Sequence, residues 1–228
     1  ILPDFPTAGI ADFSNYNDEW YLSLFKKLKG ISGEITPAYA TLDEEGVAKM
    51  HQVIPDAKII FLLRNPIDRA WSHYRFSTRD ISKKEVDEIL KANIYDFLDT
   101  DAQMLRSDYI RTIDTYLKYY PKEQFLIAFY DSIKDNPTKM LEEIVTFIGG
   151  DSSKVANECK VNSKDYVSPF FRIPEETLLF LKERYNPMVD EMNTRYGSYC
   201  QLWKWQLENN PSKDTPIKHA IRLSDEVI

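Results

Sequence analysis

The segment from Lys58 to Arg75 constrains the fold of this chain more than any other, because an apolar run changes abruptly into a turn and then into a helical pattern. Ile59–Leu63 is continuously apolar, which is typical of a strand buried on both faces of a parallel sheet. Asn65 and Pro66 end that run, since proline pushes the preceding residue towards extended geometry and suits a first helical turn. The segment therefore predicts a buried strand, a turn and a helix.

The rest of the sequence alternates between helical patterns and a second apolar run. Gln124–Tyr130 predicts another buried strand, and Ser32–Tyr39 predicts a short strand-like piece that leads into a turn. Helices are expected at residues 18–28, 41–51, 108–120, 137–148 and 174–195, the second with Thr41 as its N-cap and Glu44 as its capping-box partner. Because strands alternate with helices, we expect an α/β fold with a parallel sheet flanked by helices on both faces.

Length and composition indicate a single globular domain. With 228 residues, of which 43% are hydrophobic, the chain can bury a core without disulfides or metal. We expect the domain to cover residues 1–205 and a polar, proline-containing tail to cover residues 206–228. Cys159 and Cys200 could form a disulfide, although reduced structural thiols are the interpretation that we favour. The histidines and cysteines show no zinc spacing, so no metal is expected.

The charge of the chain limits its partners. A formal net charge of -7 argues against a general binder of nucleic acid or anionic membranes. The sequence has no apolar run of the roughly 18 residues that a membrane span needs, and its N-terminus lacks the pattern of a signal peptide. We therefore expect no nucleic-acid or membrane partner and a cytoplasmic location.

One stretch of this acidic chain is basic. From Arg64 to Lys84 the sequence has two acidic residues and six basic ones, which are Arg64, Arg69, Arg75, Arg79, Lys83 and Lys84. Arg64 stands at the end of the predicted strand, and Arg69 and Ser72 stand on the helix after it. Guanidinium groups and helix N-termini both favour oxyanions, so these residues predict a phosphate clamp.

Four motifs, taken in chain order, carry a resemblance to a known family. They are Gly33-Glu34-x-Thr36-Pro37-x-Tyr39, Arg64-Asn-Pro-x-x-Arg69-Ala-x-Ser72-x-Tyr74, Phe129-Tyr130-Asp131 and Asn162-Ser163-Lys164. Over residues 15–205 the chain resembles the sulfotransferases that use 3'-phosphoadenosine 5'-phosphosulfate (PAPS). It is most similar to the branch that contains heparan sulfate sulfotransferases and their bacterial relatives. The resemblance implies a fold like that of the P-loop NTPases.

The resemblance also implies roles for individual residues. Arg64 and Ser72 match the two ligands of the PAPS 3'-phosphate, and Arg69 matches an arginine usually found between them. Tyr130 matches a tyrosine beside the adenine, and Asn162, Ser163 and Lys164 fall where the second nucleotide loop of the family should be. Each residue also has a structural interpretation: Arg64 in a surface ion pair, Ser72 as a helix cap, Arg69 paired with Asp68 or Asp131, Tyr130 as an ordinary aromatic residue at a strand end, and Lys164 as a solvated lysine.

The sequence departs from the family pattern at two places. Ile35 replaces the lysine of the family's Glu-Lys-Thr-Pro-x-Tyr segment, and no Lys-x-Gly-Thr-Thr phosphate loop is present. We expect the first strand, loop and helix of the family to be missing from this sequence; the alternative is a degenerate relative. The catalytic residues are therefore unassigned. Glu34 is a candidate, although a structural or substrate-side role is the interpretation that we favour, and His73 is a candidate on residue type alone.

The function that the resemblance implies is transfer of a sulfuryl group from PAPS to a hydroxyl or amine acceptor, with release of 3',5'-ADP and without a metal. The acceptor would be a small molecule or a glycan, and the acidic chain favours a small or weakly charged one. One alternative is a non-catalytic relative that only binds the 3'-phosphorylated nucleotide. Another is a P-loop kinase-like protein that uses ATP, which the motif disfavours because ATP has no 3'-phosphate. The oligomeric state is left open.

Overall fold

A computed structural model describes residues 17–77, 94–158, 173–197, 200, 203 and 220–223 of the chain. Its strands are β1 (Ile59–Leu63), β2 (Phe125–Phe129) and β3 (Ala220–Arg222). Its α-helices are α1 (Asp18–Ser23), α2 (Glu44–Val53), α3 (Pro66–Ser77), α5 (Asp101–Ser107), α6 (Tyr109–Leu117), α7 (Asp131–Asp135), α8 (Pro137–Ile148), α9 (Val155–Glu158) and α10 (Glu175–Tyr196). Short 3-10 helices lie at η1 (Pro37–Thr41), η2 (Lys122–Gln124) and η3 (Ser152–Lys154).

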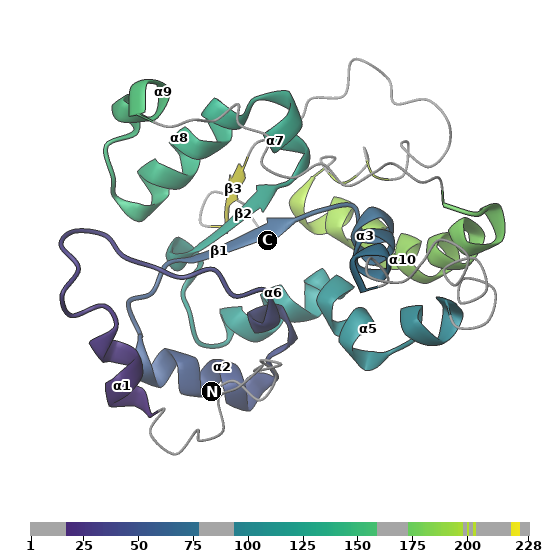
Figure 1. Ribbon diagram of the computed structural model, residues 1–228, viewed down its shortest axis with the longest axis horizontal. Coiled ribbons are helices and arrows are strands. Elements are labelled where there is room, and N and C mark those ends of the chain that lie inside the picture. The colour runs from purple at the N-terminus through teal and green to yellow at the C-terminus, as the bar shows by residue number, and fades with distance from the viewer. Residues whose placement is uncertain are drawn as a thin grey trace.

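The sheet confirms the predicted α/β architecture. Strands β1 and β2 are parallel, and Leu63 pairs with Phe129 at their carboxyl ends. In Figure 1, α8 lies on one side of the sheet and α2 and α6 lie on the other. The third strand is a correction to the predicted polar tail, because Ala220–Arg222 pairs antiparallel with β2. Ile221 lies opposite Ile127, so these few residues complete a hydrogen-bond ladder that composition alone did not reveal.

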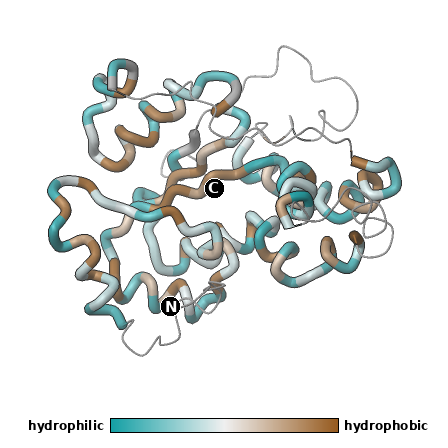
Figure 2. Tube along the Cα trace, viewed as in Figure 1, coloured by the Kyte–Doolittle hydropathy of each residue, from teal (hydrophilic) through white to brown (hydrophobic). Residues whose placement is uncertain are grey.

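The two strands are buried to different extents, although both are continuously apolar (Figure 2). All five residues of β2 are buried, as predicted. In β1 the burial alternates: Ile60 and Leu62 are 39% and 46% exposed. Phe61 and Leu63 belong to the other face, where they pack in the main core with residues of α2 and α6. The expectation that β1 is buried on both faces is therefore wrong for one of its faces.

The predicted helices are present with shifted ends, and one cap differs. The side chain of Asp43 accepts a hydrogen bond from the Gly46 backbone amide at 2.8 Å, so α2 begins at Glu44. Thr41, the predicted cap, instead ends η1, and residues 32–36 form no strand. Aspartate and threonine are both good N-caps, so sequence alone did not decide which of them the chain would use. Helix α8 ends at Gly149, as predicted, and the φ of 91° at this residue favours glycine.

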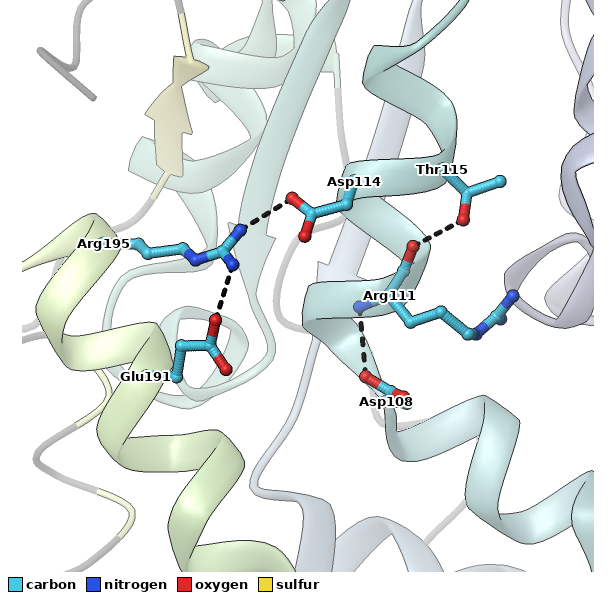
Figure 3. Close-up of polar contacts among 6 residues, drawn as sticks. All are labelled: Asp108, Arg111, Asp114, Thr115, Glu191 and Arg195. Carbon is cyan, nitrogen blue, oxygen red and sulfur yellow. Dashed lines mark hydrogen bonds and ion pairs between the residues drawn. The ribbon is translucent and has the colours of Figure 1, made fainter.

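Side chains connect helix α6 to the chain around η1 and to α10, and Figure 3 shows the contact with α10. Asp108 caps the helix by accepting a hydrogen bond from the Arg111 amide at 3.0 Å. The guanidinium of Arg111 donates to the carbonyl oxygens of Ala40 and Leu42, which fixes the chain around η1. On α10, Arg195 pairs with Asp114 of α6 at 2.7 Å and with Glu191 of its own helix at 2.5 Å. These ion pairs are partly exposed, so α6 is held mainly by its buried apolar side.

Candidate functional site

Arg64 and Tyr130 meet at the carboxyl ends of the two parallel strands. The backbone amide of Tyr130 donates to the Leu63 carbonyl at 2.7 Å, which extends the pairing of β1 and β2 by one residue. The Cζ atom of Arg64 lies 4.8 Å from the centroid of the Tyr130 ring, within the range of a cation–π contact. The Arg64 Nε atom is buried and has no hydrogen-bond partner among the described residues. A guanidinium held against a ring, with a buried donor unused, is suited to bind an anion.

The backbone around Arg64 is fixed from two sides. The hydroxyl of Tyr109 donates to the Arg64 carbonyl oxygen at 2.6 Å, and Tyr109 itself is only 2% exposed. Burial raises the pKa of Tyr109, so this hydroxyl stays protonated and remains a donor. The next residue, Asn65, accepts a hydrogen bond from the Ile67 amide at 3.0 Å and so starts α3. The position of Arg64 is thus set by the structure around it.

Arg69 contacts α5. Its Nε donates to the Ser107 hydroxyl at 2.8 Å, and a terminal nitrogen donates to the side-chain oxygen of Gln103 at 2.7 Å. Each of these partners is neutral, whereas the structural interpretation from the sequence had paired Arg69 with Asp68 or Asp131. Arg69 therefore ties α3 to α5, and its contact with a phosphate stays a prediction.

Ser72 and His73 follow on the same helix. Ser72 is half-buried and lies three residues after Arg69, so the two share one side of α3. The Nδ1 atom of His73 lies 2.8 Å from the side-chain nitrogen of Gln103, and its ring packs edge-on against Phe97. Burial lowers the pKa of His73, and the nearby charge of Arg69 acts in the same direction. His73 is therefore a neutral ring that contacts Gln103 and Phe97.

Glu34 lies at the centre of a group of hydroxyls. Its carboxylate accepts hydrogen bonds from Tyr21 at 2.7 Å, from Tyr39 at 2.5 Å and from Thr36 at 3.2 Å. Burial, together with the contact to Glu34, raises the pKa of both tyrosines, so both remain donors. A carboxylate with these three donors fixes the chain before η1.

A pocket of about 300 Å³ lies beside this group. Its walls come from α1, η1, α2 and the chain between them, and its lining residues are Tyr21, Tyr39, Leu42, Asp43, Glu45, Gly46, Lys49, Met50, Val53 and Ile54. None of the residues predicted to bind a nucleotide lines it. The candidate site at Arg64 is therefore identified from the contacts of Arg64 and from its buried Nε donor, and not from this pocket.

Some predicted site residues cannot be placed. Asn162, Ser163 and Lys164 lie outside the described residues. Within the described ranges, no group of three or more His, Cys, Asp and Glu side chains could hold a metal ion. No helix of those ranges has the length and hydropathy to cross a membrane. Cys200 is a buried thiol, and its predicted alternative partner Cys159 also lies outside the described residues.

The structure adds residues that the sequence did not single out. The sequence assigned Tyr109 only to the predicted helix at residues 108–120, yet its hydroxyl contacts Arg64. Gln103 and Ser107 are both 1% exposed and bind Arg69, and their polar side chains gave no sign of burial in the sequence. Contacts between distant parts of a chain leave no local spacing pattern, so no signal could have identified them.

Comparison with known proteins supports the expected family. A family model described as "Sulfotransferase domain" matches residues 48–170, a range that contains Arg64, Arg69, Ser72 and Tyr130. Similar curated proteins include two enzymes that are named for heparan sulfate. The mouse bifunctional heparan sulfate N-deacetylase/N-sulfotransferase 4 is 26% identical over 168 residues, which cover 65% of this chain and 19% of that protein. The human heparan sulfate glucosamine 3-O-sulfotransferase 6 is 29% identical over 137 residues, which cover 57% of this chain and 39% of that protein.

The matched region is thus about a fifth to two fifths of these relatives, at 19% and 39% of their lengths. Among solved structures, a sulfotransferase from Alicyclobacillus acidocaldarius has a similar fold, with a TM-score of 0.57 and 21% sequence identity. The similar region covers 78% of this chain and 70% of that one. This likeness shows the fold.

Proposed function

Because this chain belongs to the sulfotransferase domain family, whose model matches residues 48–170, we propose that it binds PAPS and transfers its sulfuryl group to an acceptor. The acceptor is a hydroxyl or amine of a small molecule or a glycan. In the reaction the bond between sulfur and the phosphate oxygen breaks, a bond from sulfur to the acceptor atom forms, the acceptor loses a proton, and 3',5'-ADP leaves.

The observation that carries this proposal is the state of Arg64. Its guanidinium lies 4.8 Å from the Tyr130 ring, and its Nε has no partner among the described residues. A buried donor without a partner costs free energy, so an anion that accepts from it would be bound favourably. We assign Arg64 and Ser72 to the 3'-phosphate and Tyr130 to the adenine side of the nucleotide. Arg69, held by α5, would add positive charge on the same side of α3 as Ser72.

The described residues serve binding more directly than chemistry. Glu34 accepts from three hydroxyls, and His73 contacts Gln103 and Phe97, so both candidate bases are already engaged. We therefore propose structural roles for both. These contacts also favour a second candidate function, a relative that binds the 3'-phosphorylated nucleotide without transferring the sulfuryl group.

The binding part of the proposal is tested by comparing 3',5'-ADP, 5'-AMP and ATP in calorimetric titrations. Wild-type protein should prefer 3',5'-ADP, and Arg64→Ala should lose that preference. Removing a charged hydrogen-bond partner costs roughly 1.5 to 3 kcal/mol, which corresponds to about a 10- to 150-fold loss of affinity. Lys154→Ala, which removes one exposed positive charge beside α9, is the matched control and should bind as wild type does.

The outcomes separate the alternatives. A wild-type preference for ATP would support the kinase-like alternative, and an unchanged ratio of 3',5'-ADP to 5'-AMP affinity in Arg64→Ala would refute the assigned clamp. Transfer is then tested with radiolabelled PAPS and a panel of hydroxyl, amine and glycan acceptors. Tight binding of 3',5'-ADP without transfer to any acceptor would favour the binding-only relative for the chain as it stands.

A further inference from the structure

Trp203 contacts both strand ends that carry the candidate site. Its side chain is 1% exposed, and its indole Nε1 donates to the carboxylate of Asp131 at 2.9 Å. Its backbone carbonyl accepts a hydrogen bond from the side-chain nitrogen of Asn65 at 3.3 Å. Asn65 directly follows Arg64, and Asp131 directly follows Tyr130. One residue near the C-terminal end of the predicted domain thus binds the neighbours of both site residues.

A third route joins Trp203 to Arg64. The indole ring packs edge-on against Tyr109, with the ring centroids 6.1 Å apart, and Tyr109 donates its hydroxyl to the Arg64 carbonyl. The ring also packs against Phe129, the last residue of β2, at 6.0 Å. Trp203 therefore contacts neighbours of both Arg64 and Tyr130, the two residues that form the cation–π contact.

We infer that Trp203 is a positioning residue, which holds the β1 and β2 ends in the arrangement that places Arg64 against Tyr130. The inference rests on the proposed function only for its consequence in nucleotide binding. The physical reason is preorganisation: two loops that are ordered before a ligand arrives do not have to be ordered by its binding. A bond from an indole N–H to a carboxylate is charge-assisted, and a buried tryptophan needs such a partner for its N–H.

The ordinary alternative is that Trp203 contributes only to global stability, as any buried tryptophan does. Trp203→Phe distinguishes the two, because it keeps a buried ring but removes the indole donor. The matched control is Phe125→Leu, at the opposite, amino end of β2, where Phe125 is fully buried in the same core. Asp131→Asn is the conservative variant, since the amide oxygen can still accept from the indole.

Two measurements are made on each variant of this chain at the same temperature below unfolding. The first is hydrogen exchange without ligand, read by mass spectrometry in peptides that cover residues 64–69 and 130–136. The second is the dissociation constant of 3',5'-ADP. In Trp203→Phe we expect exchange in these two peptides to quicken by about tenfold beyond the change elsewhere, because local opening is separate from global unfolding. Affinity for 3',5'-ADP should fall by about tenfold as preorganisation is lost.

Phe125→Leu should lower the melting temperature without selective exchange in those peptides and without a change in affinity. Asp131→Asn keeps an acceptor but loses its charge, so its exchange and affinity should lie between those of wild type and Trp203→Phe. Uniform exchange in Trp203→Phe, or the same pattern in Phe125→Leu, overturns the inference. If wild-type protein does not bind 3',5'-ADP, the proposed function fails, and the exchange measurement alone still decides the positioning role. If Trp203→Phe does not fold, Asp131→Leu compared with Asp131→Asn tests the same bond from its other side.

Discussion

Removing the hydroxyl of Tyr109 is expected to loosen Arg64 without disturbing the packing around it. In Tyr109→Phe the ring stays in the core, but the Arg64 carbonyl loses the donor that lies 2.6 Å away. Tyr109 is only 2% exposed, so water does not readily replace the lost hydroxyl. The variant thus isolates one buried hydrogen bond next to the candidate site.

The size of the effect follows from that geometry. Leaving a buried acceptor without its partner costs about 1 to 3 kcal/mol, and we take about 1.5 kcal/mol for this neutral bond. For a chain of this length, each kcal/mol lowers the melting temperature by roughly 2 to 4 °C, so a decrease of about 3 to 6 °C is expected. If the proposed function holds, affinity for 3',5'-ADP should fall as well, because the Arg64 backbone is no longer fixed.

Tyr116→Phe is the control from the same helix. Tyr116 is 3% exposed, and its hydroxyl donates to the Tyr39 carbonyl at 3.1 Å, away from Arg64. This longer bond should contribute less, about 0.5 to 1 kcal/mol. Both variants are measured by urea unfolding at neutral pH and by titration with 3',5'-ADP. Equal losses of unfolding free energy, or weaker nucleotide binding in Tyr116→Phe than in Tyr109→Phe, would contradict a specific role of the Tyr109 hydroxyl at Arg64.

Three further predictions concern caps, protonation and thiol reactivity. Asp43→Ala should lower the free energy of unfolding by about 1 kcal/mol because it removes the N-cap of α2, and Thr41→Ala should lower it less. A larger loss in Thr41→Ala, measured by urea unfolding, would contradict Asp43 as the cap. Burial lowers the pKa of His73 below its ordinary 6.5, so the unfolded chain binds the proton more readily than the folded chain does. The free energy of unfolding that His73 contributes is therefore lost as the pH falls below 6.5. Between pH 7.5 and pH 5.5 the free energy of unfolding should therefore decrease less in His73→Gln than in wild type. An equal decrease would exclude this contribution of His73. Burial raises the pKa of the Cys200 thiol to about 12, so in a Cys159→Ser variant a thiol reagent at pH 8 should react only after denaturant is added; rapid reaction of the native variant would contradict this burial.

Local sequence predicted most of the elements that build the site. Two strands and one helix start were predicted close to where they are observed. They were predicted from the apolar run Ile59–Leu63, the second apolar run ending near Tyr130, and the break at Asn65 and Pro66. These signals are local, because strand burial, proline geometry and helix periodicity act over a few residues. The order of strand, turn and cationic helix was sufficient to place an arginine at the carboxyl end of a strand.

Other features could not be predicted from local patterns. Whether Asp43 or Thr41 caps α2 depends on how the chain enters the helix, and the exposure of Ile60 and Leu62 depends on what packs over that face of β1. The sequence around Ala220–Arg222 is polar, so this segment resembles a tail, and only its pairing with β2 makes it a strand. In each case the deciding contact comes from elsewhere in the chain.

The same distinction applies to the candidate site. Arg64 and Tyr130 each follow an apolar strand, and the consecutive residues of each segment are enough to predict this. The folded chain alone makes the two strands neighbours, so that the Arg64 guanidinium contacts the Tyr130 ring. It also brings Trp203 to Asn65 and Asp131, the residues that follow this pair. Spatial adjacency of distant segments is set by the free energy of packing the whole core, which no short window of sequence contains.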